Sequence, residues 1–162
     1  MTTRPSSSPL VPPSDSGIFQ EVAEIDARGR LRLPPRWANI AEWVSKGDID
    51  LLIVLSSPGR LSLHDWSEAG ELVLKRFADL SDQQADEEAL RIYLDRYRRG
   101  SIGTDRRVTF DDATITHLGL PLQRPAGHPL YVSVFKTRIE ILSVEHRNQA
   151  LLSMPSLFVD LP

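Results

Sequence analysis

Apolar and polar residues alternate with a period of two in several short segments, which is the pattern of half-buried β-strands. The first two segments, 18–25 and 30–33, are separated by a short polar turn. A later pair within 51–64 flanks Pro58 and Gly59, and the last pair lies within 130–142. Proline and glycine between apolar runs favour a tight turn, because glycine readily adopts a positive φ. The pattern therefore predicts strands joined by hairpins.

Apolar residues recur at helical spacing elsewhere in the chain. Pro34 and Pro35 end the second strand and open a short helix that buries Trp37, Ile40 and Trp43. A longer helix is expected over 65–77, and Ser81 or Asp82 is expected to cap a second one. The apolar face of that second helix comprises Ala85, Ala89, Leu90, Tyr93, Leu94 and Tyr97. Its early residues are acidic and its late residues basic, which suits the helix dipole.

The second half of the chain repeats the pattern of the first. Residues 101–110 (SIGTDRRVTF) resemble 24–33 (EIDARGRLRL), and a short helix, a hairpin and a further helix follow in the same order. Arg30 and Arg107 are 77 positions apart, and Leu61 and Ile139 are 78 apart. This nearly constant offset indicates an internal duplication.

The domain organisation follows from the repeat and from composition. Residues 1–17 are rich in proline and serine, and we expect a disordered tail. The first half covers 18–80, a connecting helix 81–99, the second half 100–153, and a C-terminal tail 154–162.

Composition narrows the class of protein. The chain has 162 residues, a net charge of −3 and no cysteine, which excludes a disulfide scaffold. No apolar run approaches the roughly 20 residues that cross a bilayer, and the N-terminus lacks the pattern of a signal peptide. We therefore expect no membrane association and a cytoplasmic location.

Positive charge is concentrated in two segments. Residues 27–36 and 96–107 each carry +4, so the rest of the chain carries −11. Arginine also outnumbers lysine by 16 to 3. Arginine suits contacts with phosphates and base edges, although codon usage alone also explains a high arginine content.

The turn DARGRLRLP is the most informative segment. Gly29 permits a positive φ, and Asp26 can accept hydrogen bonds from amides of its own loop. We expect this turn to hold Arg28 and Arg30 outward, with Arg30 and Arg32 on one face of the strand. The alternative is that Asp26 and Gly29 are simply good hairpin residues and the arginines are solvated.

These residues resemble the signature of the MraZ family of bacterial transcriptional regulators, which are relatives of the AbrB-type swapped-hairpin domains. The signature, D-x-K/R-G-R-L-x-x-P, is matched from Asp26 to Pro34, and the resemblance extends over about 18–153. It implies an α+β fold: a duplicated swapped-hairpin β-barrel with flanking helices. It also implies a nucleoid-associated homo-oligomeric ring that binds promoter direct repeats in double-stranded DNA. The implied DNA-binding residues are Arg28, Arg30, Arg32, Arg106 and Arg107.

The second copy of the signature is degenerate. Gly103 stands at the position of Asp26, Asp105 at that of Arg28, and Arg106 at that of Gly29, whereas Arg107 keeps its place. An acid at a phosphate-facing position should weaken the contact of this loop with DNA. A rival hypothesis is therefore a ring-forming interaction protein that has kept the fold and lost operator binding.

Other chemistry finds no support in the sequence. The four histidines are scattered and lack metal-ligand spacing, so we expect neither a metal nor a cofactor. No nucleophile elbow or phosphate loop occurs, and Asp111 with Asp112 is better interpreted as a helix N-cap. We therefore expect no enzyme activity. Subunits are expected to meet at Trp43, Trp66 and the helix face from Tyr93 to Tyr97.

Overall fold

The computed structural model describes residues 17–153, so the predicted tails lie outside the described residues except for Gly17. The strands are β1 (Ile18–Ala23), β2 (Arg30–Arg32), β3 (Ile49–Leu55), β4 (Arg60–Asp65), β5 (Tyr97–Ile102), β6 (Arg107–Thr109), β7 (Leu130–Phe135) and β8 (Arg138–Leu142). The helices are α1 (Trp66–Asp82), α2 (Glu87–Arg96), α3 (Asp112–His117) and α4 (Val144–Ser153), with 3-10 helices η1 (Pro35–Asn39) and η2 (Glu42–Lys46).

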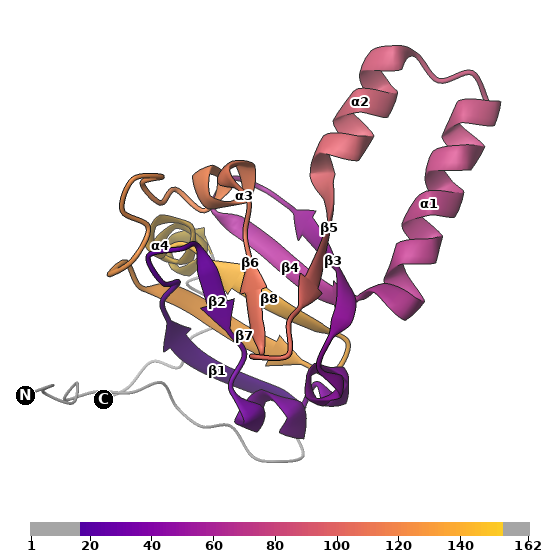
Figure 1. The fold of residues 1–162 in the computed structure, drawn as a ribbon. Helices are drawn as coiled ribbons and strands as arrows, with labels where there is room; N and C mark the ends of the chain where they lie inside the picture. The colour runs from indigo at the N-terminus through magenta and orange to yellow at the C-terminus, as the bar shows by residue number, and fades with distance from the viewer. Residues whose placement is uncertain (1–16, 154–162) are drawn as a thin grey trace, which may run out of the picture.

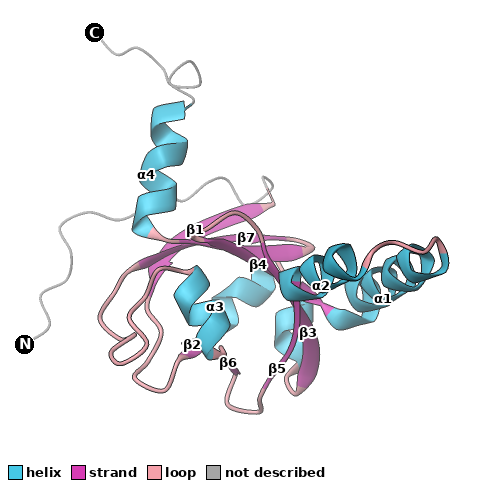
Figure 2. Cartoon of the chain, turned by 90° about the horizontal axis from the view of Figure 1, so that it is seen from above, coloured by secondary structure: helices cyan, strands magenta, loops and turns pink. Residues whose placement is uncertain are grey.

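All eight strands form one antiparallel sheet in the order β1-β7-β8-β4-β3-β5-β6-β2. A bridge between Ile25 and Leu31 joins the segment after β1 to β2, so the sheet nearly closes into a barrel. Helix α3 lies beside the strands of this barrel, whereas α4 and the pair α1 and α2 extend from it (Figures 1 and 2). The predicted α+β class, with a barrel and flanking helices, is confirmed. Within residues 17–153, no helix is both long and apolar enough to span a bilayer.

The period-two pattern fills the barrel interior. Leu130, Val132 and Val134 of β7 are buried, and their neighbours along the strand are only partly so. Leu31 of β2 and Leu33, which follows the strand, are also fully buried. Each such side chain contributes roughly 1.5–3 kcal/mol by leaving water, so this alternation fixes which face of each strand points inward.

The strand pairings follow a symmetric scheme in which β1 to β4 of the first half correspond to β5 to β8 of the second. β1 pairs with β7 as β5 pairs with β3, while β2 pairs with β6 and β4 pairs with β8. Each half therefore completes the sheet of the other half.

Helices α1 and α2 form an antiparallel hairpin that projects away from the barrel (Figure 1). The rings of Phe77 and Tyr93 lie 6.1 Å apart, and those of Tyr93 and Tyr97 lie 4.8 Å apart. The Tyr93 hydroxyl donates to the carbonyl of Val73 at 2.9 Å. Aromatic packing thus joins the two helices.

The predicted helix over 81–99 is wrong at both ends. Ser81 and Asp82 belong to the last turn of α1, and Asp86 caps α2 by accepting from the backbone N–H of Ala89 at 2.7 Å. Residues 97–99 lie in β5, where Tyr97 pairs with Val54. Pairing with the buried strand β3 outweighs the helical spacing of these residues.

The predicted short helix after Pro34 is two 3-10 helices. Trp37 and Trp43 are buried as expected, whereas Ile40 is only partly buried. The indole N–H of Trp43 donates to the carbonyl of Lys136 at 3.1 Å. Trp43 therefore packs inside one chain and is not the exposed subunit contact that the sequence suggested.

Candidate nucleic-acid interface

The loop between β1 and β2 is organised by the carboxylate of Asp26. Its Oδ1 accepts from the backbone N–H groups of Arg28 at 2.9 Å and Arg30 at 3.0 Å. Its Oδ2 accepts from the guanidinium Nε of Arg30 at 2.8 Å. The predicted role of Asp26 as the acceptor of its own loop is confirmed.

These contacts set the charge of Asp26. Partial burial acts to raise the pKa of this carboxyl, but the hydrogen bonds from Arg30 and Arg28 outweigh it. The positive charge of Arg30 acts in the same direction, so the pKa of Asp26 lies below its ordinary value. Asp26 is therefore a carboxylate at neutral pH and neutralises part of the charge of Arg30.

Gly29 supplies the backbone conformation that the loop needs. Its φ is +75°, and its carbonyl accepts from the N–H of Phe110 at 2.9 Å. A Cβ at this position would stand 2.9 Å from Cδ1 of Ile115, a buried residue of α3. Glycine thus permits both the left-handed turn and the close approach of α3 to the loop.

The loop between β5 and β6 repeats this backbone geometry with other side chains. Arg106 has a φ of +61°, and its N–H donates to the carbonyl of Gly103 at 3.0 Å, as Gly29 donates to Asp26. The carbonyl of Arg106 accepts from Leu33 at 2.9 Å, as Gly29 accepts from Phe110. The two loops are therefore conformational equivalents despite the lost glycine.

Asp105 connects the two loops. Its Oδ2 lies 3.8 Å from Nη1 of Arg30 and 3.7 Å from Nη1 of Arg107, and its Oδ1 accepts from the backbone N–H of Arg107. Only 25% of the Arg30 side chain is exposed. The expectation that Arg30 projects freely is wrong, because Asp26 and Asp105 both hold it; Arg28 is exposed as expected.

Strands β2 and β6 form a short ribbon whose outer face is basic. Arg32 lies directly opposite Arg107, and Arg30 lies opposite Thr109. The residues between them, Leu31 and Val108, point into the core. Two arginines facing each other across a strand pair repel, so this arrangement favours an anionic ligand on the ribbon.

An open depression of about 410 Å³ lies over this ribbon. Its lining comprises Glu24, Ile25, Asp26, Ala27, Arg30, Arg32, Arg107 and Ala126. Three of the five predicted arginines therefore meet in one place, and two carboxylates limit the positive charge there. The sequence does not predict Glu24 and Ala126 as part of this site, because no local pattern indicates that they lie near β2.

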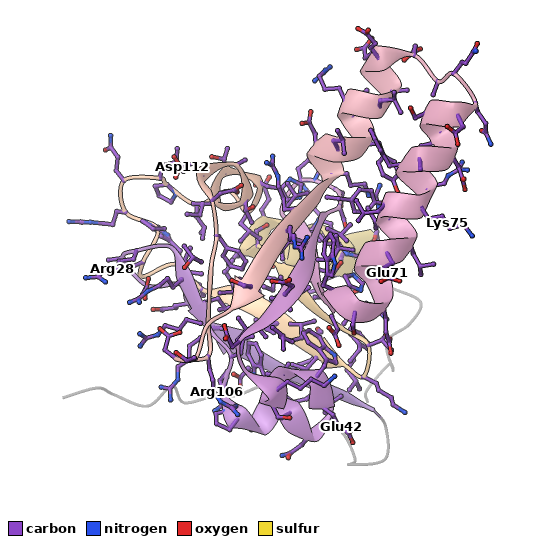
Figure 3. All side chains as sticks on the ribbon, turned by 45° about the vertical axis from the view of Figure 1, so that its right-hand side comes forward. Arg28, Glu42, Glu71, Lys75, Arg106 and Asp112 are labelled. Carbon is purple, nitrogen blue, oxygen red and sulfur yellow. The ribbon has the colours of Figure 1, made fainter. Side chains whose placement is uncertain are left out.

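The two remaining arginines lie apart from each other. Arg28 and Arg106 are at different ends of the ribbon, because each precedes one strand of an antiparallel pair (Figure 3). The Nη1 atom of Arg106 is buried and has no hydrogen-bond partner among the described residues. Arg106 therefore contributes more to the packing of its loop than to an exposed basic surface.

Within residues 17–153, no group of histidine and acidic side chains is placed to hold a metal ion. A depression of about 420 Å³ is lined by residues of η2, β4 and α1. A depression of about 440 Å³ beside α3 and α4 is lined by His117, His128 and His146, but His117 and His146 contact the carbonyls of Arg60 and Pro58, respectively.

Neither a scan against protein-family models nor a search of curated proteins finds a match for the chain.

Proposed function

We propose that this protein is a sequence-specific DNA-binding transcriptional regulator of the MraZ type. The β2–β6 ribbon contacts the DNA, with Arg32 and Arg107 on phosphates and Arg28 at one end of the ribbon. Arg30 makes a weaker contribution than its place in the motif suggests, because Asp26 and Asp105 already engage it.

The observation that carries this proposal is the placement of Arg32 opposite Arg107 on an exposed ribbon. Like charges in register cost stability unless something offsets them. Asp105 offsets part of the charge of Arg107, and phosphates bound by the two guanidinium groups would offset the rest. The remaining surface is acidic in total, which would direct a nucleic acid toward this ribbon.

The duplicated swapped-hairpin architecture is part of the proposal. It is supported by strand pairing that survives exchange of the halves and by loops that share φ values and backbone hydrogen bonds. A swapped hairpin is one whose strands pair with the other half, as β1 does with β7. This arrangement and the D-x-R-G-R-L-x-x-P segment together support the MraZ resemblance.

Few basic residues are available on each chain, so affinity must come from several chains acting together. Subunits of a homo-oligomer that bind repeated sites raise the effective concentration of each further contact. Several basic ribbons that bind at once would offset the weak contact made by each chain, whose net charge is −3. The rival is an interaction protein of the same fold, and it is favoured by exposed aliphatic side chains on the α1–α2 hairpin.

The test is a gel shift with the DNA upstream of the protein's own gene and a scrambled duplex of equal length. We expect preferential binding of the upstream DNA, strong loss in Arg32→Ala/Arg107→Ala, and no loss in Lys136→Ala, which removes an exposed positive charge from the turn between β7 and β8. Equal binding of both duplexes would refute sequence specificity. Absence of binding in a chain that still oligomerises would favour the interaction protein.

A further inference from the structure

The α1–α2 hairpin exposes more aliphatic surface than its own packing explains. Phe77 and Tyr93 pack between the two helices, and Tyr97 of β5 packs against Tyr93. Leu72 and Ile92 are nevertheless 68% and 57% exposed, and Leu74 and Leu94 are also more than half exposed. Four of the nine large exposed hydrophobic residues within 17–153 thus belong to one projecting element.

Charge is ordered around these residues. On α2, Glu88, Ile92 and Arg96 are four positions apart and form one stripe that runs from acid through aliphatic to base. On α1, Glu68, Leu72 and Arg76 form a second stripe in the same order.

A stripe in this order is complementary to itself. When two copies of α2 lie antiparallel and meet at Ile92, Glu88 of each copy faces Arg96 of the other. In a parallel arrangement like charges would meet instead. This order of charges, which also suits the helix dipole, therefore fits a second copy in the antiparallel orientation and disfavours the parallel one.

We propose that the α1–α2 hairpin is a self-association surface, on which a second copy of this chain packs antiparallel with Ile92 of α2 at the twofold axis. Two symmetric Glu88–Arg96 pairs flank Ile92, and the hairpin of each copy contributes further aliphatic surface. The surface does not include the β2–β6 ribbon, so this inference stands without DNA binding.

Both charged side chains of the α2 stripe lie at the surface. Arg96 has no ion pair within the described residues. Glu88 is 76% exposed, and its ion pair with Arg91 at 3.7 Å is a solvent-exposed contact that costs little to exchange. Arg96 lies over the ring of Tyr97 at 6.0 Å from its centroid, which leaves its guanidinium at the surface. Substitutions here should therefore change association without unfolding the barrel.

The experiment measures the mass of the full chain over a dilution series without DNA, by sedimentation velocity and by light scattering. Wild type is compared with Ile92→Ser, Glu88→Arg and the exchange variant Glu88→Arg/Arg96→Glu. Leu152→Ser on α4, where Leu152 is 81% exposed, is the matched control. Circular dichroism confirms that each variant is folded.

We expect reversible association of wild type and of the control. Ile92→Ser and Glu88→Arg should each weaken association by about tenfold or more, and the exchange variant should restore it. The exchange places each charge at the less favourable end of the helix dipole, so restoration cannot arise from a more stable α2. A monomeric wild type, normal association of Ile92→Ser, or an exchange variant no better than Glu88→Arg would each overturn the proposal.

Discussion

At the scale of single residues, one carboxylate and one glycine shape the first loop. Asp26 binds two backbone N–H groups and the Arg30 guanidinium, and Gly29 provides the left-handed turn. Both roles follow from the residue types in a short segment, so the sequence predicts them. The contact between Asp105 and Arg30 is different, because it joins residues from the two halves that no local pattern relates.

The first prediction concerns pH. The pKa of Asp26 is lowered from its ordinary 3.8, so the unfolded chain binds the proton more tightly than the folded chain. The stabilisation is therefore complete above that ordinary value and is lost as pH falls through the lowered folded value. Asp26→Asn should lower the free energy of unfolding at neutral pH by about 1 kcal/mol, with a shallower loss in acid.

Acid unfolding followed by circular dichroism checks this prediction. Asp79→Asn, which changes an exposed carboxylate of α1, should unfold like wild type. A profile for Asp26→Asn that parallels wild type below about pH 4 would show that Asp26 contributes nothing to acid sensitivity.

The second prediction separates backbone strain from steric overlap. Gly29 and Gly119 have nearly equal φ values, +75° and +74°, but only Gly29 has a close neighbour, Cδ1 of Ile115 at 2.9 Å. Gly119→Ala should destabilise by about 1 kcal/mol through φ alone, and Gly29→Ala by about 2–3 kcal/mol in total. Chemical denaturation measures both, and equal losses would contradict the overlap.

At the scale of elements, the sequence predicts the strands better than the helix boundaries. The alternation around Leu31, Val132 and Ile139 places the barrel interior, because burial of one strand face leaves a two-residue period. The same rule cannot find the start of β5. Tyr97 continues the helical spacing of α2, and only its pairing with β3 assigns it to a strand.

The third prediction tests the observed start of α2. Asp86 accepts from Ala89 N–H, whereas Asp82 lies in the last turn of α1. Asp86→Ala should lower the free energy of unfolding by about 0.5–2 kcal/mol, as loss of an N-cap does. Asp82→Ala should lie within about 0.5 kcal/mol of wild type. Thermal unfolding distinguishes them, and a larger loss in Asp82→Ala would place the cap where the sequence suggested.

Two charged contacts hold the segments that follow β2 and β6 against neighbouring strands. Glu21 of β1 accepts two hydrogen bonds from Arg36 and one from the indole N–H of Trp37, which holds η1 against the barrel. In the second half, Arg98 of β5 lies 3.6 Å from Asp111, the N-cap of α3. Neither contact could be predicted from a local pattern, because each joins residues of different elements.

At the scale of the whole molecule, the site is assembled from both halves. Arg32 and Arg107 come from opposite halves and meet only because β2 pairs with β6. The sequence identifies both arginines as candidates through the repeat, but it does not show that they face each other.

The fourth prediction concerns Asp105, which holds Arg30 and Arg107. Asp105→Asn should release both guanidinium groups and raise affinity for DNA, because it removes a negative charge beside the bound phosphates. Fluorescence anisotropy with labelled upstream DNA measures the change. Asp95→Asn on α2 is the control and should bind as wild type; an unchanged or weaker affinity for Asp105→Asn would place the second loop away from the DNA.

The most direct test of the central claim is the salt dependence of DNA binding by wild type and by Arg32→Ala/Arg107→Ala. Each lost phosphate contact should reduce the slope of log K against log salt concentration by about 0.9. Two contacts per chain therefore predict a slope shallower by roughly 1.8 for each subunit bound, with lower affinity at every salt concentration. Equal slopes and equal affinities for the two proteins would show that the β2–β6 ribbon does not contact DNA.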